Sequence, residues 1–462
     1  MFLNCHSYHS LRYGTISVEE LVQQYVGMGI DTVALTDINT ITGIYDFHRL
    51  CKKHHIKPIV GVEIRNDNQL YYICLAKNRT GIAEINRLLT EQNCEGKELP
   101  IYHPSFSEVI VIYPFNNFPA ELHQNEYIGV RPEEVNLLMN ASLKKYISKM
   151  VILQPVTFST KKEYNLHKIL RAIDRNTLVT KLEENDYCKK SETFIPPSQL
   201  LNKFQQYPQI IQNTKWILEQ CHFEFDYSTP KNKKHFTDSK ENDFNLLKRL
   251  AYKGLKKRYP NNDETAKARV EKELNVIHQL NFCAYFLITW DIVQYSNKMG
   301  FMHVGRGSGA NSIIAYCLGI TDICPLELDL YFERFLNLNR KTPPDFDIDW
   351  SWQERDIILR YIFDKYGKDH VAFCGTNVEF KYKSILREVG KVFGLPKEEL
   401  DALTTKPIEQ HDDNSVSRLV HQYGKLLEKF PNQRSMHSCG ILISEEPITN
   451  FTALEMPPKG FP

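Results

Sequence analysis

Acidic and apolar residues alternate over one short segment of this 462-residue chain, and the alternation restricts its fold more than any other feature. Residues 343–350 read Pro-Pro-Asp-Phe-Asp-Ile-Asp-Trp. Because successive side chains of a strand point to opposite faces, Asp345, Asp347 and Asp349 share one face and the apolar residues share the other. Three neighbouring carboxylates repel one another unless a cation neutralises them. The segment therefore predicts a strand that packs on one face and binds metal on the other.

The spacing of these carboxylates suits a two-metal site. Residues i and i+2 of a strand lie roughly 6.5–7 Å apart at Cα, so Asp345 and Asp347 can converge on two Mg²⁺ ions about 3.5–4 Å apart. That arrangement serves in-line phosphoryl displacement. An edge strand whose outward acids guard against aggregation is the alternative interpretation.

A glycine-rich segment, residues 303–312, lies upstream and leads into an apolar helix. Its glycines let backbone N–H groups approach an anion, Arg306 adds positive charge, and Ser308 can cap the helix, whose positive end then faces a phosphate. The segment is neither a P-loop nor the dinucleotide fingerprint. It predicts a phosphate-binding loop, with a plain tight turn as the alternative. Arg334, just before the acidic strand, is a second candidate phosphate ligand or otherwise a surface arginine.

The N-terminal part of the chain predicts an α/β domain. Short apolar runs alternate there with helical stretches, a pattern typical of a parallel sheet or barrel. The expected strands are 32–35, 58–62, 71–76, 109–113 and 150–153, and the expected helices are 18–27 and 43–53. From about residue 165 to 219 the sequence is helical.

A basic segment follows over residues 231–258, where ten Lys or Arg stand against three acids. Pro230 and the polar residues after it indicate a domain boundary. The segment predicts either a solvated linker and helix face or a surface that follows phosphates.

The composition excludes several classes of protein. The formal net charge is +1, and the eleven cysteines include no C-x-x-C pair, which indicates a reduced, cytoplasmic protein. No apolar run reaches about 18 residues and no secretory signal is present at the N-terminus, so we expect no membrane association.

Together these motifs resemble a known family. The segment from the glycine loop to Trp350 is similar to the palm of the bacterial DNA polymerase III alpha subunit, a C-family polymerase, and the likeness extends to HSCGILISEEPITNF at residues 437–451. The N-terminal region resembles the PHP domain of the same family. The resemblance implies a multidomain α/β and α+β fold, with a PHP-type (β/α) barrel followed by a polymerase-beta-like nucleotidyltransferase palm that carries a helical thumb insertion. The implied domains are PHP 1–225, palm 226–375, thumb 376–431 and a second palm segment 432–462.

The resemblance also implies residue roles and an activity. It implies a DNA-directed DNA polymerase, in which two Mg²⁺ ions catalyse nucleotidyl transfer from a dNTP to a primer 3′-OH. Asp349 is left as a supporting residue, and the family's third catalytic aspartate is expected beyond Pro462, so we interpret the chain as an N-terminal fragment that is inactive alone. The catalytic metal ligands are then Asp345 and Asp347, and the nucleotide-binding residues are Arg306, Gly307, Ser308, Arg334 and His437. His437 is otherwise a packed histidine at a strand end.

The metal site of the PHP domain is incomplete by the same comparison. Only His6, Asp37 and Glu63 remain of the expected ligands. Proline and isoleucine cannot ligate metal, and threonine substitutes poorly for imidazole. We therefore expect no metal in this domain and no proofreading exonuclease activity. The residues standing where ligands are expected are Asn4, Ile38, Tyr71, Pro155 and Thr157.

Partners follow from the same resemblance. Lys381, Lys383 and Arg387 open a helix whose basic residues suit contact with the DNA backbone, with a solvated helix face as the alternative. The implied partners are primer-template DNA, dNTP, and a sliding clamp and other replisome or damage-tolerance subunits that bind through regions absent here. The eroded PHP site favours the error-prone branch over the replicative alpha subunit. A PHP-type metallo-phosphoesterase or exonuclease and a non-catalytic DNA-binding scaffold are the alternatives.

Overall fold

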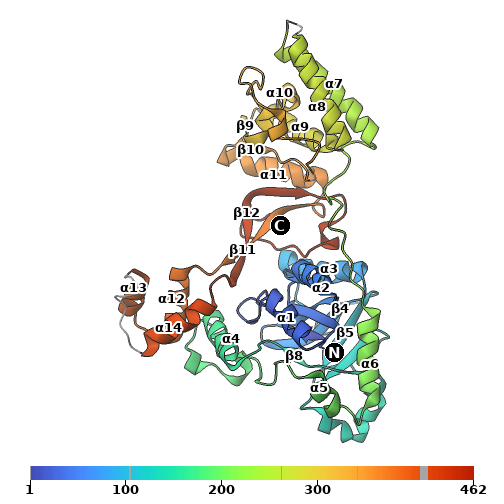
Figure 1. Cartoon of the computed structure of the whole chain (residues 1–462), viewed down its shortest axis with the longest axis vertical. Helices are drawn as coiled ribbons and strands as arrows, with labels where there is room; N and C mark the ends of the chain where they lie inside the picture. The colour runs from blue at the N-terminus through green and yellow to red at the C-terminus, as the bar shows by residue number, and fades with distance from the viewer. Residues whose placement is uncertain (1, 104–105, 262, 341, 406–414) are drawn as a thin grey trace. The chain divides into compact units, whose positions relative to one another are not determined.

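The chain divides into two compact units in the computed structural model, which describes residues 2–103, 106–261, 263–340, 342–405 and 415–462. The first unit comprises Met1–Phe225, Phe373–Gly440 and Thr449–Pro462. The second comprises Asp226–Ala372 and Ile441–Ile448. Figure 1 shows both units and labels many of their helices and strands.

A six-stranded sheet in the order β2-β3-β4-β5-β6-β7 forms the centre of the first unit. Its strands are near-continuous apolar runs, which is what burial on both faces requires. The pair β1–β8 forms a separate parallel sheet in which Asn4 lies opposite Pro155. The strands are β1 (Asn4–Cys5), β2 (Thr32–Ile38), β3 (Lys57–Asn66), β4 (Gln69–Ala76), β5 (Val109–Pro114), β6 (Glu126–Val130), β7 (Met150–Ile152) and β8 (Pro155–Val156).

The sheet is mixed, which corrects the expectation of a parallel one. The pairs β2–β3, β5–β6 and β6–β7 are parallel, whereas β3–β4 and β4–β5 are antiparallel. Only Asp67 and Asn68 separate β3 from β4. Two residues are too few for the crossover that parallel neighbours need, so β4 must turn back along β3.

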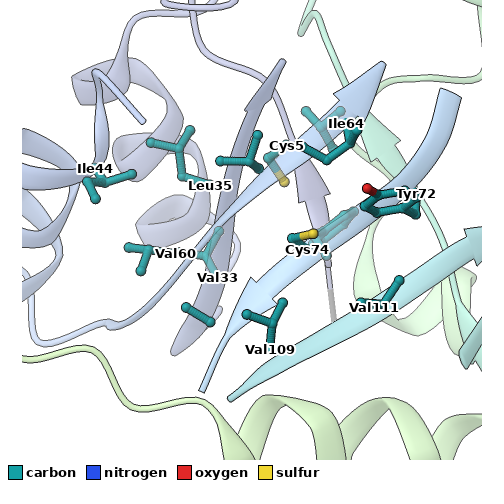
Figure 2. Packing of buried hydrophobic residues seen from close by; sticks show 14 of the residues in the cluster. Cys5, Val33, Leu35, Ile44, Val60, Ile64, Tyr72, Cys74, Val109 and Val111 are labelled. Carbon is teal, nitrogen blue, oxygen red and sulfur yellow. The ribbon is translucent and has the colours of Figure 1, made fainter. Parts of the chain in front are cut away.

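The apolar side chains of the sheet fill a core on each of its faces. Figure 2 shows residues from β1, β2, β3, β4 and β5 meeting on one of these faces, among them Cys5, Val33, Val60, Cys74 and Val109. The helix α1 (Val18–Gly27) packs its apolar residues against this core and starts at a capping box made by Ser17 and Glu20.

The remaining elements of the first unit are mostly helical. Three helices near the C-terminus pack on α4 around their own apolar cluster, which contains Leu170, Leu386 and Val420. The strands β11 (Val371–Glu379) and β12 (Pro431–Ile443) form a two-stranded sheet, of which Phe373–Glu379 and Pro431–Gly440 belong to the first unit. The helices and turns are α2 (Ile44–Lys53), α3 (Arg79–Glu95), η1 (Val135–Met139), η2 (Ala141–Lys149), α4 (Lys161–Asp174), η3 (Val179–Lys181), η4 (Glu184–Asp186), α5 (Pro197–Lys203), α6 (Pro208–Gln220), α12 (Tyr382–Val392), α13 (Lys397–Thr405), α14 (Ser415–Leu426) and η8 (Ile448–Asn450).

The second unit packs helices against the two-stranded sheet of β9 and β10. Gly254 lets α7 approach α10 closely, because a Cβ there would lie 2.0 Å from the carbonyl oxygen of Cys317. The elements are α7 (Lys240–Arg258), α8 (Glu264–Gln279), α9 (Cys283–Lys298), β9 (His303–Arg306), η5 (Gly307–Asn311), α10 (Ile313–Leu318), η6 (Phe332–Arg334), β10 (Asp347–Trp350) and α11 (Trp352–Tyr366).

None of the helices in the described ranges is by itself long and apolar enough to cross a membrane. The two helices α8 and α9 reach the required length and composition only as a pair, with a bend of 114° between them.

Candidate active site

The acidic segment forms strand β10, which runs antiparallel to β9 in the second unit. Asp347 lies opposite Arg306 and Asp349 lies opposite Val304. All three aspartates are exposed, whereas Phe346 and Ile348 pack against the apolar core of the unit. The alternation of faces expected from the sequence is therefore present in β10, and it places Asp347 and Asp349 beside the glycine-rich segment, whereas Asp345 lies before the strand begins.

Arg306 neutralises two of these carboxylates. Its Nε donates to Oδ2 of Asp349 at 2.7 Å, and its Nη1 lies 3.6 Å from Oδ2 of Asp347. The side chains of all three residues are half exposed, so each pair is individually weak. A guanidinium thus supplies the positive charge that the paired carboxylates need.

Asp345 lies just before β10 and faces a different arginine. Arg340 Nη2 lies 3.6 Å from Oδ1 of Asp345, whose side chain is 84% exposed. The same guanidinium donates to the backbone carbonyls of Phe335, Thr342 and Pro343. Arg340 therefore fixes the loop that leads into the carboxylate strand.

Gly307 brings the backbone of the loop against the carboxylate strand. Its φ is +69°, and a Cβ at this position would lie 2.6 Å from Oδ2 of Asp347. A side chain would therefore meet both backbone strain and a carboxylate oxygen. The segment Gly307–Asn311, which includes Ser308, forms the 3₁₀ turn η5, and this turn contacts both β10 and η6.

The sequence prediction for the helix after this loop was wrong in two respects. Ser312 caps α10, accepting from the N–H of Ala315 at 3.1 Å, because Ser308 belongs to the preceding 3₁₀ turn. The positive end of α10 is also occupied by the buried carboxylate of Glu273, which accepts from the N–H of Ile313 at 3.2 Å and of Ile314 at 3.3 Å. This helix end therefore does not face a free anion site.

Glu273 itself is held by two further partners. Ser312 Oγ donates to it at 2.8 Å, and Arg269 Nε donates at 2.8 Å. Arg269 also donates to the carbonyls of Asn311 and Leu330, which joins the end of η5 to the segment before η6. Burial raises the pKa of Glu273 above its ordinary value, although Arg269 and Ser312 act in the opposite direction.

Arg334 ends the short turn η6 and is exposed, whereas Phe332 and Phe335 on either side of it in the sequence are buried. Because η6 contacts η5, the structure brings Arg334, the glycine loop and the carboxylate strand into one region of the second unit. The site thus combines exposed carboxylates with exposed guanidinium groups, and Arg306 lies directly beside Asp347 and Asp349.

The carboxylates fit a divalent cation by the chemistry of their donors. Carboxylate oxygens are hard ligands, and Mg²⁺ is commonly held by one or two of them, with water and substrate phosphates completing the shell. Across the described ranges, no group of three or more His, Cys, Asp or Glu side chains is arranged to hold a metal ion. The fit of Asp345 and Asp347 to a cation thus rests on the chemistry of their oxygens, and each of the two carboxylates faces a different arginine.

The other candidate residues lie in the first unit. His437 on β12 is exposed, and its Nδ1 accepts from the N–H of Gly440 at 2.9 Å. Lys381 and Lys383 are exposed at the start of α12. Arg387 forms an ion pair of 3.2 Å with Asp401 on α13, so its charge is already partly neutralised.

The incomplete metal site of the barrel contains a buried ion-pair network. Glu63 is fully buried on β3, and its Oε2 accepts from Asn4 Nδ2 at 2.7 Å and lies 3.0 Å from His6 Nε2. Its Oε1 accepts from Arg65 Nε at 2.5 Å. Arg65 in turn stacks over the ring of Tyr13. Burial opposes ionisation of Glu63, but Arg65 and His6 outweigh it and hold the pKa well below its ordinary value.

Thr157 extends this network. Its Oγ1 lies 3.0 Å from His6 Nδ1 and donates to Glu192 Oε2 at 3.2 Å, and Glu192 pairs with Arg131 at 3.0 Å. Thr157, which stands where the family resemblance implies a ligand, therefore lies next to His6.

Ile38 lies opposite Glu63 in the β2–β3 pair, whereas the side chains of Asp37 and Tyr71 form hydrogen bonds with residues outside this network. Both oxygens of Asp37 accept from Ser7 and Ser10. Tyr71 accepts from Asn66 at 3.1 Å. The side chains present here do not suit a metal ion. Arg65 neutralises Glu63, and the carboxylate oxygens of Asp37 accept hydrogen bonds from Ser7 and Ser10.

Three important residues were missed by the sequence analysis. Arg65 stands two positions after Glu63 on the same strand. Two opposite charges in an otherwise apolar run could have indicated a buried ion pair. Arg340 lies five residues before Asp345 and resembles any loop arginine. Glu273 lies 39 residues before Ser312 on an amphipathic helix, and no local pattern marks it.

Two family models match the chain. One, described as the bacterial DNA polymerase III alpha NTPase domain, matches residues 245–460, which include the carboxylate strand and the glycine loop. The other, described as the PHP domain, matches residues 3–117, which include His6, Asp37 and Glu63.

Curated relatives match nearly the whole chain. It is 27% identical to the error-prone DNA polymerase of Symbiobacterium thermophilum over 99% of the chain and 48% of that protein. It is 28% identical to the DNA polymerase III subunit alpha of Bacillus subtilis and 29% identical to that of Borreliella burgdorferi, each over 98% of the chain and 45% of the relative. The chain thus spans about half the length of the curated relatives it matches.

Proposed function

We infer that this chain, which belongs to the family of bacterial DNA polymerase III alpha subunits and error-prone DNA polymerases, provides the nucleotide- and metal-binding part of a template-directed DNA polymerase. The observation that carries this proposal is the β9–β10 pair, on which Asp347 lies beside Arg306 and Gly307. Carboxylates for a cation and a guanidinium for a polyphosphate are then neighbours. These are the two requirements of nucleotidyl transfer.

In this proposal each group has a separate role. Asp345 and Asp347 hold two Mg²⁺ ions, which when bound neutralise the charge that develops on the transferring phosphoryl group. Arg306 and Arg334 pair with the triphosphate, and the backbone at Gly307 and Ser308 donates to its oxygens. Exposure of these side chains supports the proposal because a nucleotide can reach them.

The remaining assignments are proposals of the same kind. We assign the PHP domain to residues 1–225, the palm to 226–375 and 432–462, and the thumb to 376–431. The partners are primer-template DNA, at Lys381, Lys383 and Arg387, and dNTP at the palm, with His437 as a further nucleotide contact. A sliding clamp and other replisome or damage-tolerance subunits bind other parts of the protein, in the cytoplasm. The error-prone branch is supported by the replaced PHP ligands, while relatives of both names have similar identities.

Manganese binding tests the proposed site. We expect the chain to bind Mn²⁺ in the presence of a dNTP, measured by electron paramagnetic resonance, and Asp345→Asn and Asp347→Asn to weaken that binding at least about tenfold by removing one carboxylate ligand. Asp364→Asn is the matched control, since Asp364 is exposed on α11. Unchanged Mn²⁺ affinity in both site variants contradicts the proposal. Loss of Mn²⁺ on replacing His6 or Glu63 instead favours a PHP phosphoesterase.

Arg306 is expected to oppose metal binding and support nucleotide binding. Arg306→Gln removes the guanidinium from Asp347 and Asp349, so Mn²⁺ without nucleotide should bind about fivefold more tightly, the equivalent of ~1 kcal/mol for an exposed ion pair. The same change should weaken dNTP binding about tenfold or more, because a charge-assisted contact is lost. Isothermal titration measures both constants, with Arg360→Gln on α11 as the control. If Arg306→Gln changed the affinities for Mn²⁺ and for dNTP in the same direction, this role would be contradicted.

A further inference from the structure

Helix α7 carries a row of basic side chains on its solvent face. Its C-terminal half contains no acidic residue between Asn245 and Tyr259. At about 100° per residue the five cations fall within an arc of about 180°, and at 1.5 Å per residue they extend over about 13 Å. We call this surface the α7 basic stripe. It consists of the exposed residues Lys248, Arg249, Lys253, Lys256 and Lys257.

Within the described ranges, no acid forms an ion pair with any member of the stripe. The acids nearest in sequence lie away from the stripe. Glu241 is in the first turn of α7, and buried Asp243 accepts hydrogen bonds from the backbone of Phe236 and Thr237. On the neighbouring helix α8, Glu271 accepts from Tyr252. Arg258, by contrast, pairs with Asp322 at 2.7 Å and is therefore not included in the stripe.

The opposite face of α7 is already packed. Leu247 and Ala251 belong to the apolar core of the second unit, and Gly254 contacts α10, the helix that follows the glycine loop. Because no apolar face is free, α7 cannot insert into a lipid surface as an amphipathic helix does. What it offers outward is positive charge alone.

We propose that the α7 basic stripe binds the phosphate backbone of duplex DNA. Both strands of a duplex present about one negative charge per 1.7 Å of axis, so about 13 Å of axis carries roughly eight phosphates, and those on the near side of the duplex can meet the five cations. Single-strand grooves interleave aromatic side chains with the basic ones. On the stripe only the half-buried Tyr252 could serve this purpose, and it is engaged with Glu271. The stripe thus fixes position on the duplex without reading base sequence.

The salt dependence of DNA binding tests this surface. The triple variant Lys253→Gln/Lys256→Gln/Lys257→Gln removes three phosphate contacts, so the slope of log affinity against log salt should fall by about 2.7, from about 0.9 per contact. Affinity for a duplex of unrelated sequence should fall at least about tenfold at 0.1 M salt. Fluorescence anisotropy with a labelled duplex between 50 and 200 mM salt measures both quantities, and circular dichroism checks that the variant folds.

A charge-matched control separates a binding surface from net charge. Lys161→Gln/Lys162→Gln/Lys203→Gln removes the same charge from exposed sites of the first unit and should leave the slope unchanged. An equal loss of DNA affinity in both triple variants overturns the proposal. It is also overturned if the stripe variant keeps its DNA affinity and loses only binding to anionic phosphatidylserine vesicles or to polyglutamate. Asp345→Asn/Asp347→Asn should keep the full slope, so failure of the proposed nucleotide site is distinguishable from failure of the stripe.

Discussion

Replacing Arg65 by alanine should destabilise the centre of the first unit by about 3–5 kcal/mol, the cost of leaving a buried charge without its partner. Glu63 is 0% exposed and depends on the Arg65 guanidinium at 2.5 Å for neutralisation. Hydrogen exchange of the β3 amides measures the effect within that unit, and the opening equilibrium should rise by roughly a hundredfold to a thousandfold or more. Arg49→Ala, which breaks an exposed pair with Asp46, should change it by less than ~1 kcal/mol.

A double replacement distinguishes a coupled pair from two independent residues. Exchanging both partners for apolar residues in Glu63→Met/Arg65→Met removes the unpaired charge, so the double variant should lose less stability than Arg65→Ala alone. A double variant that loses as much stability as Arg65→Ala, or more, would contradict the coupling of Glu63 and Arg65.

The pH dependence of the same network has a definite sign. The pKa of Glu63 is lowered in the folded chain, so the unfolded chain takes up the proton first as the solution is acidified. The stabilisation is therefore complete above the ordinary glutamate pKa of about 4.3 and declines as pH falls below it. The stability difference between the wild-type chain and Glu63→Gln should shrink over that range.

The sequence predicted the features that depend only on neighbouring residues, such as helix bounds and the alternating faces of a strand. Helix α1 has the expected bounds because Ser17 and Glu20 form its capping box and its apolar residues follow the helical period. The alternating faces of β10 follow directly from the pleat of a strand. Both patterns are complete within a few residues, so distant contacts are not needed to establish them.

Features that depend on distant partners could not be predicted in this way. The choice of Ser312 over Ser308 as the helix cap depends on where the 3₁₀ turn ends, and Glu273 approaches that cap from another helix. The antiparallel β4–β5 pair likewise requires the positions of whole elements. In the first unit, the sequence predicted an incomplete ligand set around Glu63, but it did not reveal the ion pair that Arg65 forms with Glu63.

Glu273→Ala should produce the largest change at the glycine loop. It removes the acceptor of Ser312, Ile313 and Ile314 and leaves Arg269 without its carboxylate, a loss of about 3–5 kcal/mol in local stability. Hydrogen exchange of Ile313–Leu318 should accelerate by roughly a hundredfold or more. Glu273→Gln keeps an acceptor of similar size and should lose less.

The same variants test whether Glu273 positions the nucleotide site without touching the nucleotide. Because Arg269 also binds the carbonyl of Asn311 at the end of η5, loosening the pair should weaken dNTP binding, while Mn²⁺ alone should bind as before at the site proposed for Asp345 and Asp347. Glu264→Ala on the same helix removes an 83% exposed carboxylate and should change neither quantity. If Glu273→Gln accelerated exchange in α10 but left dNTP affinity unchanged, the pair would stabilise the helix alone, and Arg306 and Gly307 would keep their geometry without it.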